Sequence, residues 1–240
     1  MKPVVILQHT EVGAPGWVPS ILDELGLPSV VVNLMEGGTT PATAREYAGV
    51  ITLGGHMSVY DPLPWIAGEI ALIREAASLG IPIAGHCLGS QIMAVAFGAK
   101  VGRNARPEIG WNHIVVDSTP RAREWLGADS GEPLLAFQWH SDTFELPPGA
   151  ERMATSEHCQ NQIFVVDDRH LAMQCHLEMT PALVDLSVSR NGAQLDREFA
   201  SGNAAVTSRE QTLENLSVRT TGMRAVLLRL YSRWAESIES

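Results

Sequence analysis

Two short clusters in this sequence combine residue types that could carry out nucleophilic catalysis. Cys87 stands in the segment Gly-His-Cys-Leu-Gly-Ser-Gln at residues 85–91, directly after an apolar run at residues 81–84, and a later cluster at residues 175–178 contains His176 and Glu178. A cysteine between glycines, at the end of a buried strand and the start of a helix, is the thiol form of a nucleophile elbow. There the free N–H groups and positive dipole end of the helix favour the thiolate. The chemistry to expect is acyl transfer through a thioester.

His176 and Glu178 could supply the base and its orienting carboxylate. At a strand end both side chains would leave the same face, roughly 6.5 to 7 Å apart along the backbone. The carboxylate could then hold one imidazole nitrogen and leave the other for the thiol. Alone, a buried cysteine is more often a core residue and a His-x-Glu pair more often structural. Because Gly85 and Gly89 would leave room beside the Cys87 sulfur for a substrate carbonyl, the combination favours a catalytic triad.

A pair of glycines could complete this site with an oxyanion hole. Gly54 and Gly55 follow an apolar run at residues 49–53. Two glycines at the end of a buried strand allow a backbone N–H to point into a cleft, so the expected donors are the Gly55 N–H and the Leu88 N–H at the head of the elbow helix. By itself the glycine pair indicates only a tight turn.

Hydrophobic periodicity in the first half predicts strands that alternate with helices. Short apolar runs predict strands at residues 4–7, 29–33, 49–53 and 81–84. Helical spacing predicts helices at residues 17–25, 41–47 and 65–79. This alternation predicts an α/β fold with a doubly wound, mostly parallel sheet and right-handed crossovers.

The second half is expected to add a mixed antiparallel edge to that sheet. Strands are predicted at residues 112–116, 133–138, 162–166 and 170–174, the last two as a hairpin. A helix is predicted at residues 181–190, with Thr180 as its N-cap and Pro181 in first position.

The C-terminal segment is predicted to be helical. After a connection at residues 192–202, apolar residues at helical spacing predict one long helix over residues 203–240. Its apolar stripe indicates packing against the sheet, with a cap over the site or an oligomer interface as the alternative. One domain is therefore expected, with residues 1–190 as its body and residues 191–240 as a helical extension packed on it.

Composition narrows the class of protein. The 17 basic and 27 acidic residues give a formal net charge of −10, which argues against non-specific binding to nucleic acid. The cysteines at positions 87, 159 and 175 have neither Cys-x-x-Cys spacing nor an even count, so neither a zinc site nor a disulfide framework is expected. No apolar run approaches the roughly eighteen residues of a membrane span. A cytoplasmic protein without metal or cofactor is expected.

Taken together, the three motifs resemble those of class I (triad) glutamine amidotransferases. Residues 85–91 look like the Gly-x-Cys-x-Gly-x-Gln nucleophile motif of that family, residues 54–55 like its glycine-pair oxyanion strand, and residues 176–178 like its His-x-Glu motif. The resemblance covers residues 4–186. Within the family, this part of the chain is similar to the amidotransferase domain of GMP synthase and to the stand-alone relatives of that domain. It implies a flavodoxin-like class I amidotransferase fold.

The resemblance also implies roles for individual residues. Cys87 would attack the γ-carboxamide of glutamine, His176 would pass the thiol proton to the leaving ammonia, and Glu178 would orient His176. Gln91, one helical turn after Cys87, would contact the substrate. A substrate-binding loop is implied at residues 138–142, with contacts from Gln138, Trp139 and His140.

Three residues depart from the family pattern. His86 stands where an apolar residue usually precedes the cysteine, Ser90 where histidine is common, and His56 where proline often follows the glycine pair. His86 could act on the thiol or face the packing of the sheet. These departures bear on substrate preference more than on the triad.

Three functions follow from the resemblance. The first is hydrolysis of glutamine to glutamate and ammonia, with the ammonia passed to a separate synthetase subunit, since the sequence has no P-loop motif and no segment for an acceptor module. The second is hydrolysis of γ-glutamyl peptides or amides by the same triad. The third is an inactive binding or regulatory subunit. The expected partners are glutamine or a γ-glutamyl compound, a synthetase subunit and a second copy of the chain, without nucleic acid or membrane.

Overall fold

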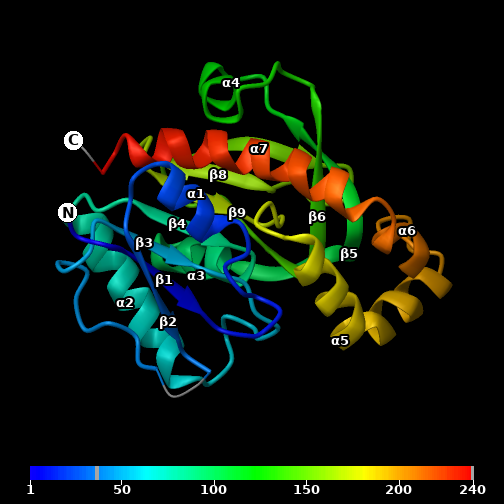
Figure 1. Ribbon diagram of the computed structural model, residues 1–240, viewed down its shortest axis with the longest axis horizontal. Helices are drawn as coiled ribbons and strands as arrows, with labels where there is room; N and C mark the ends of the chain where they lie inside the picture. Colours follow the sequence, from blue (N-terminus) through cyan, green and yellow to red (C-terminus); the bar gives the residue numbers. More distant parts are fainter. Residues whose placement is uncertain (36–37, 239–240) are drawn as a thin grey trace.

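The computed structural model of this chain describes residues 1–35 and 38–238 and is built around one nine-stranded sheet. The strand order is β2-β1-β3-β4-β9-β8-β7-β5-β6 (Figure 1). In the N-terminal half, β1 (Val4–Gln8) lies between β2 (Ser29–Asn33) and β3 (Gly49–Thr52), and β4 (Ile83–His86) pairs with β3. These strands run parallel, and β9 (His170–Met173) joins β4 in the same direction. The predicted α/β fold is confirmed.

The other half of the sheet is antiparallel. It consists of β5 (Val101–Val116), β6 (Pro133–Phe144), β7 (Ala150–Ser156) and β8 (Ile163–Val166). The strands predicted at residues 112–116 and 133–138 are parts of the longer β5 and β6, and β7 was not predicted. The predicted hairpin is the β8–β9 pair, whose turn holds Asp167 and Asp168 at positive φ. Aspartate tolerates this backbone region better than most residues.

Alternating side chains on the strands divide the core into two layers. Val4 and Ile6 pack in one cluster with α1 (Val18–Glu24), α4 (Pro120–Leu126) and α7 (Leu216–Ala235). Val5 and Leu7 pack in the other with α2 (Pro64–Ser78) and α3 (Leu88–Ala96). Helix α5 (Pro181–Ala200) and α6 (Arg209–Leu213) lie beside the sheet (Figure 1). Because successive strand residues face opposite sides of the sheet, α1, α4 and α7 cover one face and α2 and α3 cover the other.

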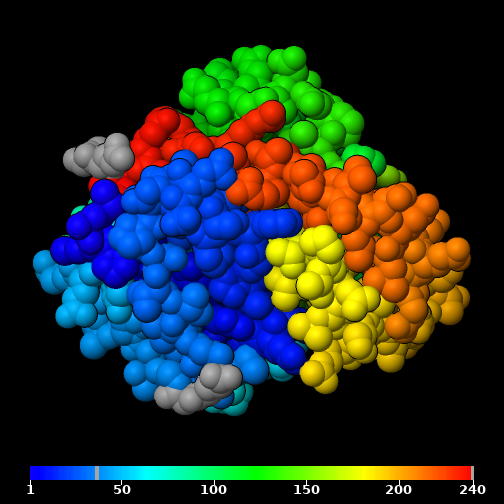
Figure 2. Space-filling view, viewed as in Figure 1, coloured from blue at the N-terminus to red at the C-terminus, as the bar shows by residue number. Residues whose placement is uncertain are grey.

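The C-terminal helix is part of this core. Figure 2 shows the orange and red residues of α7 lying against the N-terminal segment on one side and the green segment that contains α4 on the other. Leu227, Leu230 and Trp234 are fully buried. The packing role predicted for the apolar stripe of this helix is confirmed.

Three helix predictions need correction. No helix forms at residues 41–47, because the Glu75 carboxylate accepts hydrogen bonds from Thr43 Oγ1 (2.9 Å) and the Ala44 N–H (2.7 Å), and these fix a turn. The single helix predicted over residues 203–240 is two helices, α6 and α7, separated at Asn215 in the left-handed region (φ 55°). Residues 239–240 of that prediction lie outside the described residues.

The helix predicted at residues 181–190 begins where expected but continues to Ala200. Thr180 Oγ1 accepts the Leu183 N–H at 3.2 Å, so the predicted N-cap is confirmed. The connection expected at residues 192–202 is therefore mostly helix. Among the described residues, no helix has both the length and the apolar character needed to cross a membrane.

A buried histidine makes stability depend on pH. His170 is 2% exposed, and its ring packs against Phe97 at 5.5 Å between centroids. Burial lowers the pKa of His170 to about 4, with Asp167 opposing and Arg169 assisting. The unfolded chain takes up this proton near pH 6.5 and the native chain only near pH 4, so stability should fall as pH falls through that window, by at most about 3 kcal/mol.

We expect the substitution His170→Phe to remove most of this acid sensitivity. The free energy of unfolding in urea would be measured at about pH 7 and about pH 4.5 for parent and variant. The exposed His113, replaced by glutamine, is the control. An equal loss of stability on acidification in His170→Phe and parent would contradict the assignment.

Candidate active site

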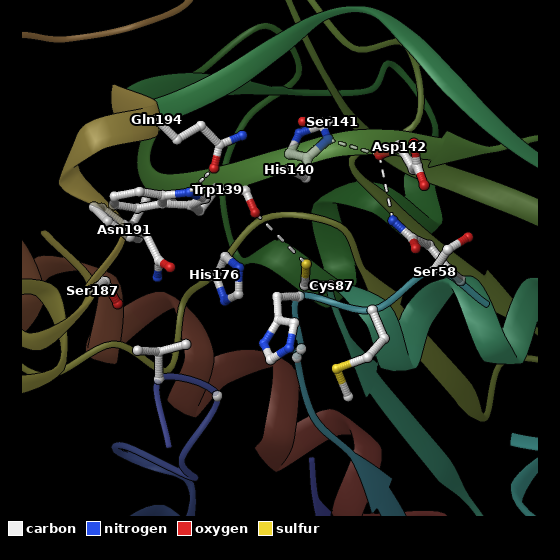
Figure 3. Close-up of a pocket in the computed structure, with 18 of the residues that line it drawn as sticks. Ser58, Cys87, Trp139, His140, Ser141, Asp142, His176, Ser187, Asn191 and Gln194 are labelled. Atoms are coloured by element: carbon white, nitrogen blue, oxygen red, sulfur yellow. Dashed lines mark hydrogen bonds between the residues drawn. The ribbon is translucent and has the colours of Figure 1, made fainter. Parts of the chain in front are cut away.

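The nucleophile elbow is formed by a strained backbone turn between β4 and α3. Cys87 has φ 49° and ψ −108°, and α3 begins at Leu88. The Cys87 N–H donates to the Met173 carbonyl of β9 at 2.8 Å, which holds the turn on the sheet. Positive φ is unfavourable for a residue with a side chain, and such strain is typical of a nucleophile elbow. The turn places the thiol in a cavity at the carboxyl ends of the parallel strands (Figure 3).

The flanking glycines are required by packing within the elbow. A Cβ atom on Gly89 would lie 2.2 Å from the Thr52 carbonyl oxygen, and one on Gly85 would lie 2.5 Å from Met93 Sδ. The Gly89 N–H donates to the Leu53 carbonyl at 3.1 Å. Packing of α3 against β3 at Gly89 and against β4 at Gly85 therefore requires both glycines, and the room that they are expected to leave for substrate stays a prediction.

We expect Gly89→Ala to destabilise the fold by at least about 2 kcal/mol, because its Cβ would meet backbone atoms that cannot move without shifting β3. The midpoint of urea unfolding would be the measurement. Gly222→Ala is the matched control, since a Cβ there meets nothing within 4 Å and alanine suits the interior of α7. Equal stability of the two variants would refute this account of the elbow.

His176 lies directly after β9 and is held beside Cys87. Its N–H donates to the Phe137 carbonyl at 2.8 Å, and its Nδ1 bonds Glu178 Oε1 at 2.6 Å. A Cβ on Gly54 would lie 3.2 Å from His176 Cε1 and 3.6 Å from Cys87 Cβ, so the imidazole, thiol and glycine strand meet at one point. A carboxylate can only accept, so Nδ1 carries the proton and Nε2 faces the cavity. Burial lowers the pKa of His176, but Glu178 and Cys87 outweigh it, and the net shift is strongly upward.

Glu178 is a buried carboxylate shared by two histidines. It is 2% exposed; Oε1 bonds His176 and Oε2 bonds His86 Nδ1 at 2.9 Å. Burial acts to raise the pKa of Glu178, but the two histidines lower it far below its ordinary value. The Glu178 carbonyl accepts the Trp17 N–H at 2.8 Å, which fixes the backbone. The carboxylate is thus ionised and held in place.

The segment that follows β3, with Gly54 and Gly55, is fixed by a buried ion pair between His9 and Glu69. His9 Nδ1 donates to the Leu53 carbonyl at 3.1 Å, and His9 Nε2 to Glu69 Oε2 at 2.8 Å. Burial acts to lower the pKa of His9, but the charge of Glu69 and these hydrogen bonds outweigh it, and the pKa is raised. Within the described part of the chain, no acceptor takes the N–H of Gly55 or Leu88. Both predicted oxyanion donors are therefore available.

The thiol opens into a cavity of about 330 Å³. On one side of Cys87 lies Asp142, whose carbonyl faces Gln91 Nε2 at 3.4 Å (Figure 3). On the side of His176 lie Asn191 and Ser187 of α5 (Figure 3). We call the part of the cavity on the Gln91 side of the sulfur the Gln91 lobe and the part on the side of His176 the His176 lobe.

The residues predicted to bind substrate fall into different places. Gln91, Trp139 and His140 line the cavity, and Trp139 Nε1 donates to Gln194 Oε1 at 3.0 Å. Gln138 is fully buried and is not among the lining residues, so its predicted contact with substrate has no support from the structure. Gln194, Asn191 and Ser187 were not predicted, although their polar side chains recur at helical spacing.

The other two cysteines are buried away from the cavity. Burial raises the pKa of Cys159 to about 11 and that of Cys175 well above its ordinary value. Cys159 Sγ, His140 and Glu108 have ligand-type atoms within 4.8 Å of one another. The Glu108 carboxylate already accepts from His140, Ser156 and Gln162 at 2.7 to 2.9 Å, so these groups form a hydrogen-bonded core cluster.

Comparison with known proteins agrees with the fold and with the motifs. Residues 17–194, about three quarters of the chain, match the sequence profile of the family Glutamine amidotransferase class-I. The chain is 31% identical to the glutamine amidotransferase-like protein YfeJ of Salmonella typhimurium over 165 residues, 66% of this chain and 68% of that protein. It is 32% identical to the GMP synthase of Bordetella avium over 162 residues, 63% of this chain but 30% of that protein.

Solved structures extend the similarity over the whole chain. A glutamine amidotransferase from Methylobacillus flagellatus has a TM-score of 0.94 and 36% sequence identity, covering 99% of this chain and 95% of its own. One from Thermotoga maritima has a TM-score of 0.83 and 29% identity, covering 99% and 98%. The resemblance inferred from the three motifs is confirmed, and the chain belongs to the class I glutamine amidotransferase family.

Proposed function

We propose that this protein hydrolyses the γ-carboxamide of glutamine to glutamate and ammonia through a thioester on Cys87. The observation that carries this proposal is that the Cys87 thiol and the His176 imidazole both line the cavity, with the ionised Glu178 bonded to His176 Nδ1. We place the triad and the oxyanion donors in residues 1–190 and treat residues 191–240 as an extension packed on the same domain, which adds Asn191 and Gln194 to the cavity.

The proposed reaction has two steps. His176 Nε2 takes the Cys87 proton, the sulfur attacks the carbonyl carbon of the γ-carboxamide, and the N–H groups of Gly55 and Leu88 stabilise the oxyanion. His176 then gives its proton to the departing ammonia as the C–N bond breaks, leaving a γ-glutamyl thioester. In the second step His176 activates a water that cleaves the thioester to glutamate and free thiol. Glu178 keeps the His176 ring oriented and stabilises the imidazolium.

The lobe beside Gln91 is the proposed position of the α-amino and α-carboxylate groups of glutamine. Gln91 Nε2 is held by Gln174 Oε1 at 3.1 Å, which leaves Gln91 Oε1 for the substrate ammonium. Trp139 and His140 also line the cavity and are proposed to contact the substrate. The similarity to part of GMP synthase supports transfer of the ammonia to a separate acceptor protein.

Release of glutamate and ammonia from glutamine by the purified chain tests this function. The chain would be assayed alone and after addition of candidate synthetase subunits. Turnover that depends on Cys87 supports the proposal. No Cys87-dependent release in any of these mixtures would overturn it and favour the third reading, an inactive binding or regulatory subunit.

A second candidate activity, hydrolysis of γ-glutamyl amides larger than glutamine, is favoured by the lobe beside His176. The triad histidine protonates the leaving amine, so the amine must depart on the His176 side. Ser187 and Asn191 of α5 line that side. Their side chains make no hydrogen bond within the described residues, so both side chains are free to bind a polar substituent on the amine.

The substitution Asn191→Leu separates the two activities. If γ-glutamyl amides of amino acids are substrates, we expect their KM to rise about tenfold, the effect of losing one buried hydrogen bond. The KM for glutamine should stay within about twofold, since ammonia does not reach α5. Initial rates with glutamine and γ-glutamylglycine are the measurement. Equal effects on both substrates would count against a leaving-group site at α5.

A further inference from the structure

A hydrogen-bonded chain continues beyond the triad to the C-terminal helix. His86, the residue before the nucleophile, is fully buried between Glu178 and Tyr231 of α7. Its Nδ1 bonds Glu178 Oε2 at 2.9 Å, and its Nε2 bonds the Tyr231 hydroxyl at 2.8 Å. The Tyr231 ring is itself fully buried and packs against His86 and Trp234. The carboxylate of the triad therefore has a second support that reaches α7.

The positions of the protons in this chain follow from the partners. The Glu178 carboxylate only accepts, so His86 Nδ1 must carry a proton. Among the described residues the Tyr231 hydroxyl has no other hydrogen-bond partner, so its O–H donates to His86 Nε2, which is the bare nitrogen. Burial and the negative charge of Glu178 raise the pKa of Tyr231 well above its ordinary value, so its hydroxyl keeps the proton. Every donor and acceptor in the chain from Tyr231 to His176 is thus matched.

We propose that His86 and Tyr231 are positioning residues for the triad: Tyr231 donates to Nε2 and fixes the position of the His86 ring, and His86 holds Glu178 in the orientation that His176 needs. This inference rests on the proposed function. It makes α7 part of the catalytic apparatus, although α7 lies outside residues 17–194, the segment that the family profile matches.

Removing one partner should affect the others in a defined order. Without the Tyr231 hydroxyl, His86 Nε2 has no proton donor, and the ring, held at Nδ1 alone, can tilt away from the position in which it supports Glu178. Without His86, one oxygen of a buried carboxylate loses the only donor that the described residues give it, and Glu178 can rotate away from His176. Both changes act on the orientation of His176 and leave the lobe that binds glutamine intact.

The test compares Tyr231→Phe with Thr220→Val, a matched removal of a buried hydroxyl from the same helix. Thr220 is fully buried, and the one partner of its hydroxyl among the described residues is the Leu216 carbonyl of its own helix. For Tyr231→Phe we expect kcat on glutamine to fall about tenfold with KM unchanged, and for Thr220→Val neither constant to change. His86→Leu should lose about a hundredfold in kcat, whereas His86→Asn, whose amide can still donate to Glu178, should recover part of it.

Nitrogen-15 NMR of the histidine rings gives a readout that needs no turnover. In the parent, His86 should show a single tautomer with the proton on Nδ1 and a hydrogen-bonded Nε2, and in Tyr231→Phe the Nε2 signal should shift because its donor is lost. Unchanged His86 and His176 signals in Tyr231→Phe, or a fall in kcat matched by Thr220→Val, would overturn the inference. Absence of glutamine hydrolysis in the parent would instead contradict the proposed function, and the NMR signals would still decide the role of Tyr231.

Discussion

Cys87→Ala is expected to abolish hydrolysis of glutamine, with kcat falling at least about 10⁴-fold. Alanine leaves no nucleophile at the elbow, and water would have to attack an unactivated amide. The substitution should leave the fold intact, because the side chain is small and its hydrogen bond to the Trp139 carbonyl is long, at 4.0 Å. Glutamate release measured at saturating glutamine, with the unfolding temperature as a check on folding, gives the result.

Cys159→Ala is the control for that variant. Its thiol is buried and bonds Thr143 and Asn161, outside the cavity. Activity should be retained, and brief treatment with iodoacetamide should label Cys87 alone in the parent, because the other two thiols are buried with raised pKa values. Retained activity in Cys87→Ala would exclude the thioester mechanism. Inactivation of both variants would point to lost folding.

The features predicted correctly from the sequence depend on local pattern. The elbow at Cys87, the hairpin at residues 165–170 and the N-cap at Thr180 are each set by residues within a few positions of one another. The parallel strands follow in the same way from short apolar runs. Such features need no knowledge of which segments meet in the fold.

The features that could not be predicted depend on contacts between distant segments. Tyr231 meets His86 only because α7 packs over β4, and nothing near either residue indicates the pairing. The turn at residues 41–47 is fixed by Glu75 from another helix, which overrides local helix propensity. Gln138 and Trp139 are neighbours on β6, yet one faces the buried side of the sheet and the other the cavity. The packing of the sheet decides which one can bind substrate.

Glu178→Gln is expected to lower kcat by about 10² to 10⁴-fold, with KM for glutamine changed by less than about threefold. The amide keeps the size of the side chain but removes the charge. Only one of its two terminal atoms can still accept, so either His176 or His86 faces an NH₂ group. The ring of His176 then loses its fixed tautomer or its orientation, and the imidazolium loses its counter-charge. Substrate contacts in the Gln91 lobe are unaffected.

The substitution Glu178→Gln should also change the pKa of His176 in a known direction. Because Glu178 is a main cause of the raised pKa of His176, its neutralisation should lower that pKa. The imidazolium would then be lost at a lower pH than in the parent, and the acid limb of the kcat/KM profile, which reports the free imidazole that acts as base, should move to lower pH. NMR titration of the His176 ring measures the shift directly. A profile that moves to higher pH would contradict the assigned hydrogen bonds.

Glu108→Gln is the matched control, because Glu108 is an equally buried glutamate that bonds a histidine, His140, at 2.9 Å. Losing that charge should cost stability, since Ser156 and Gln162 also donate to the carboxylate. Its effect on kcat should be far smaller, and the His176 titration should not move, because Glu108 makes no hydrogen bond to the triad. If the two variants lost kcat equally, burial of a carboxylate would matter rather than its place beside His176, and the role assigned to Glu178 would fail.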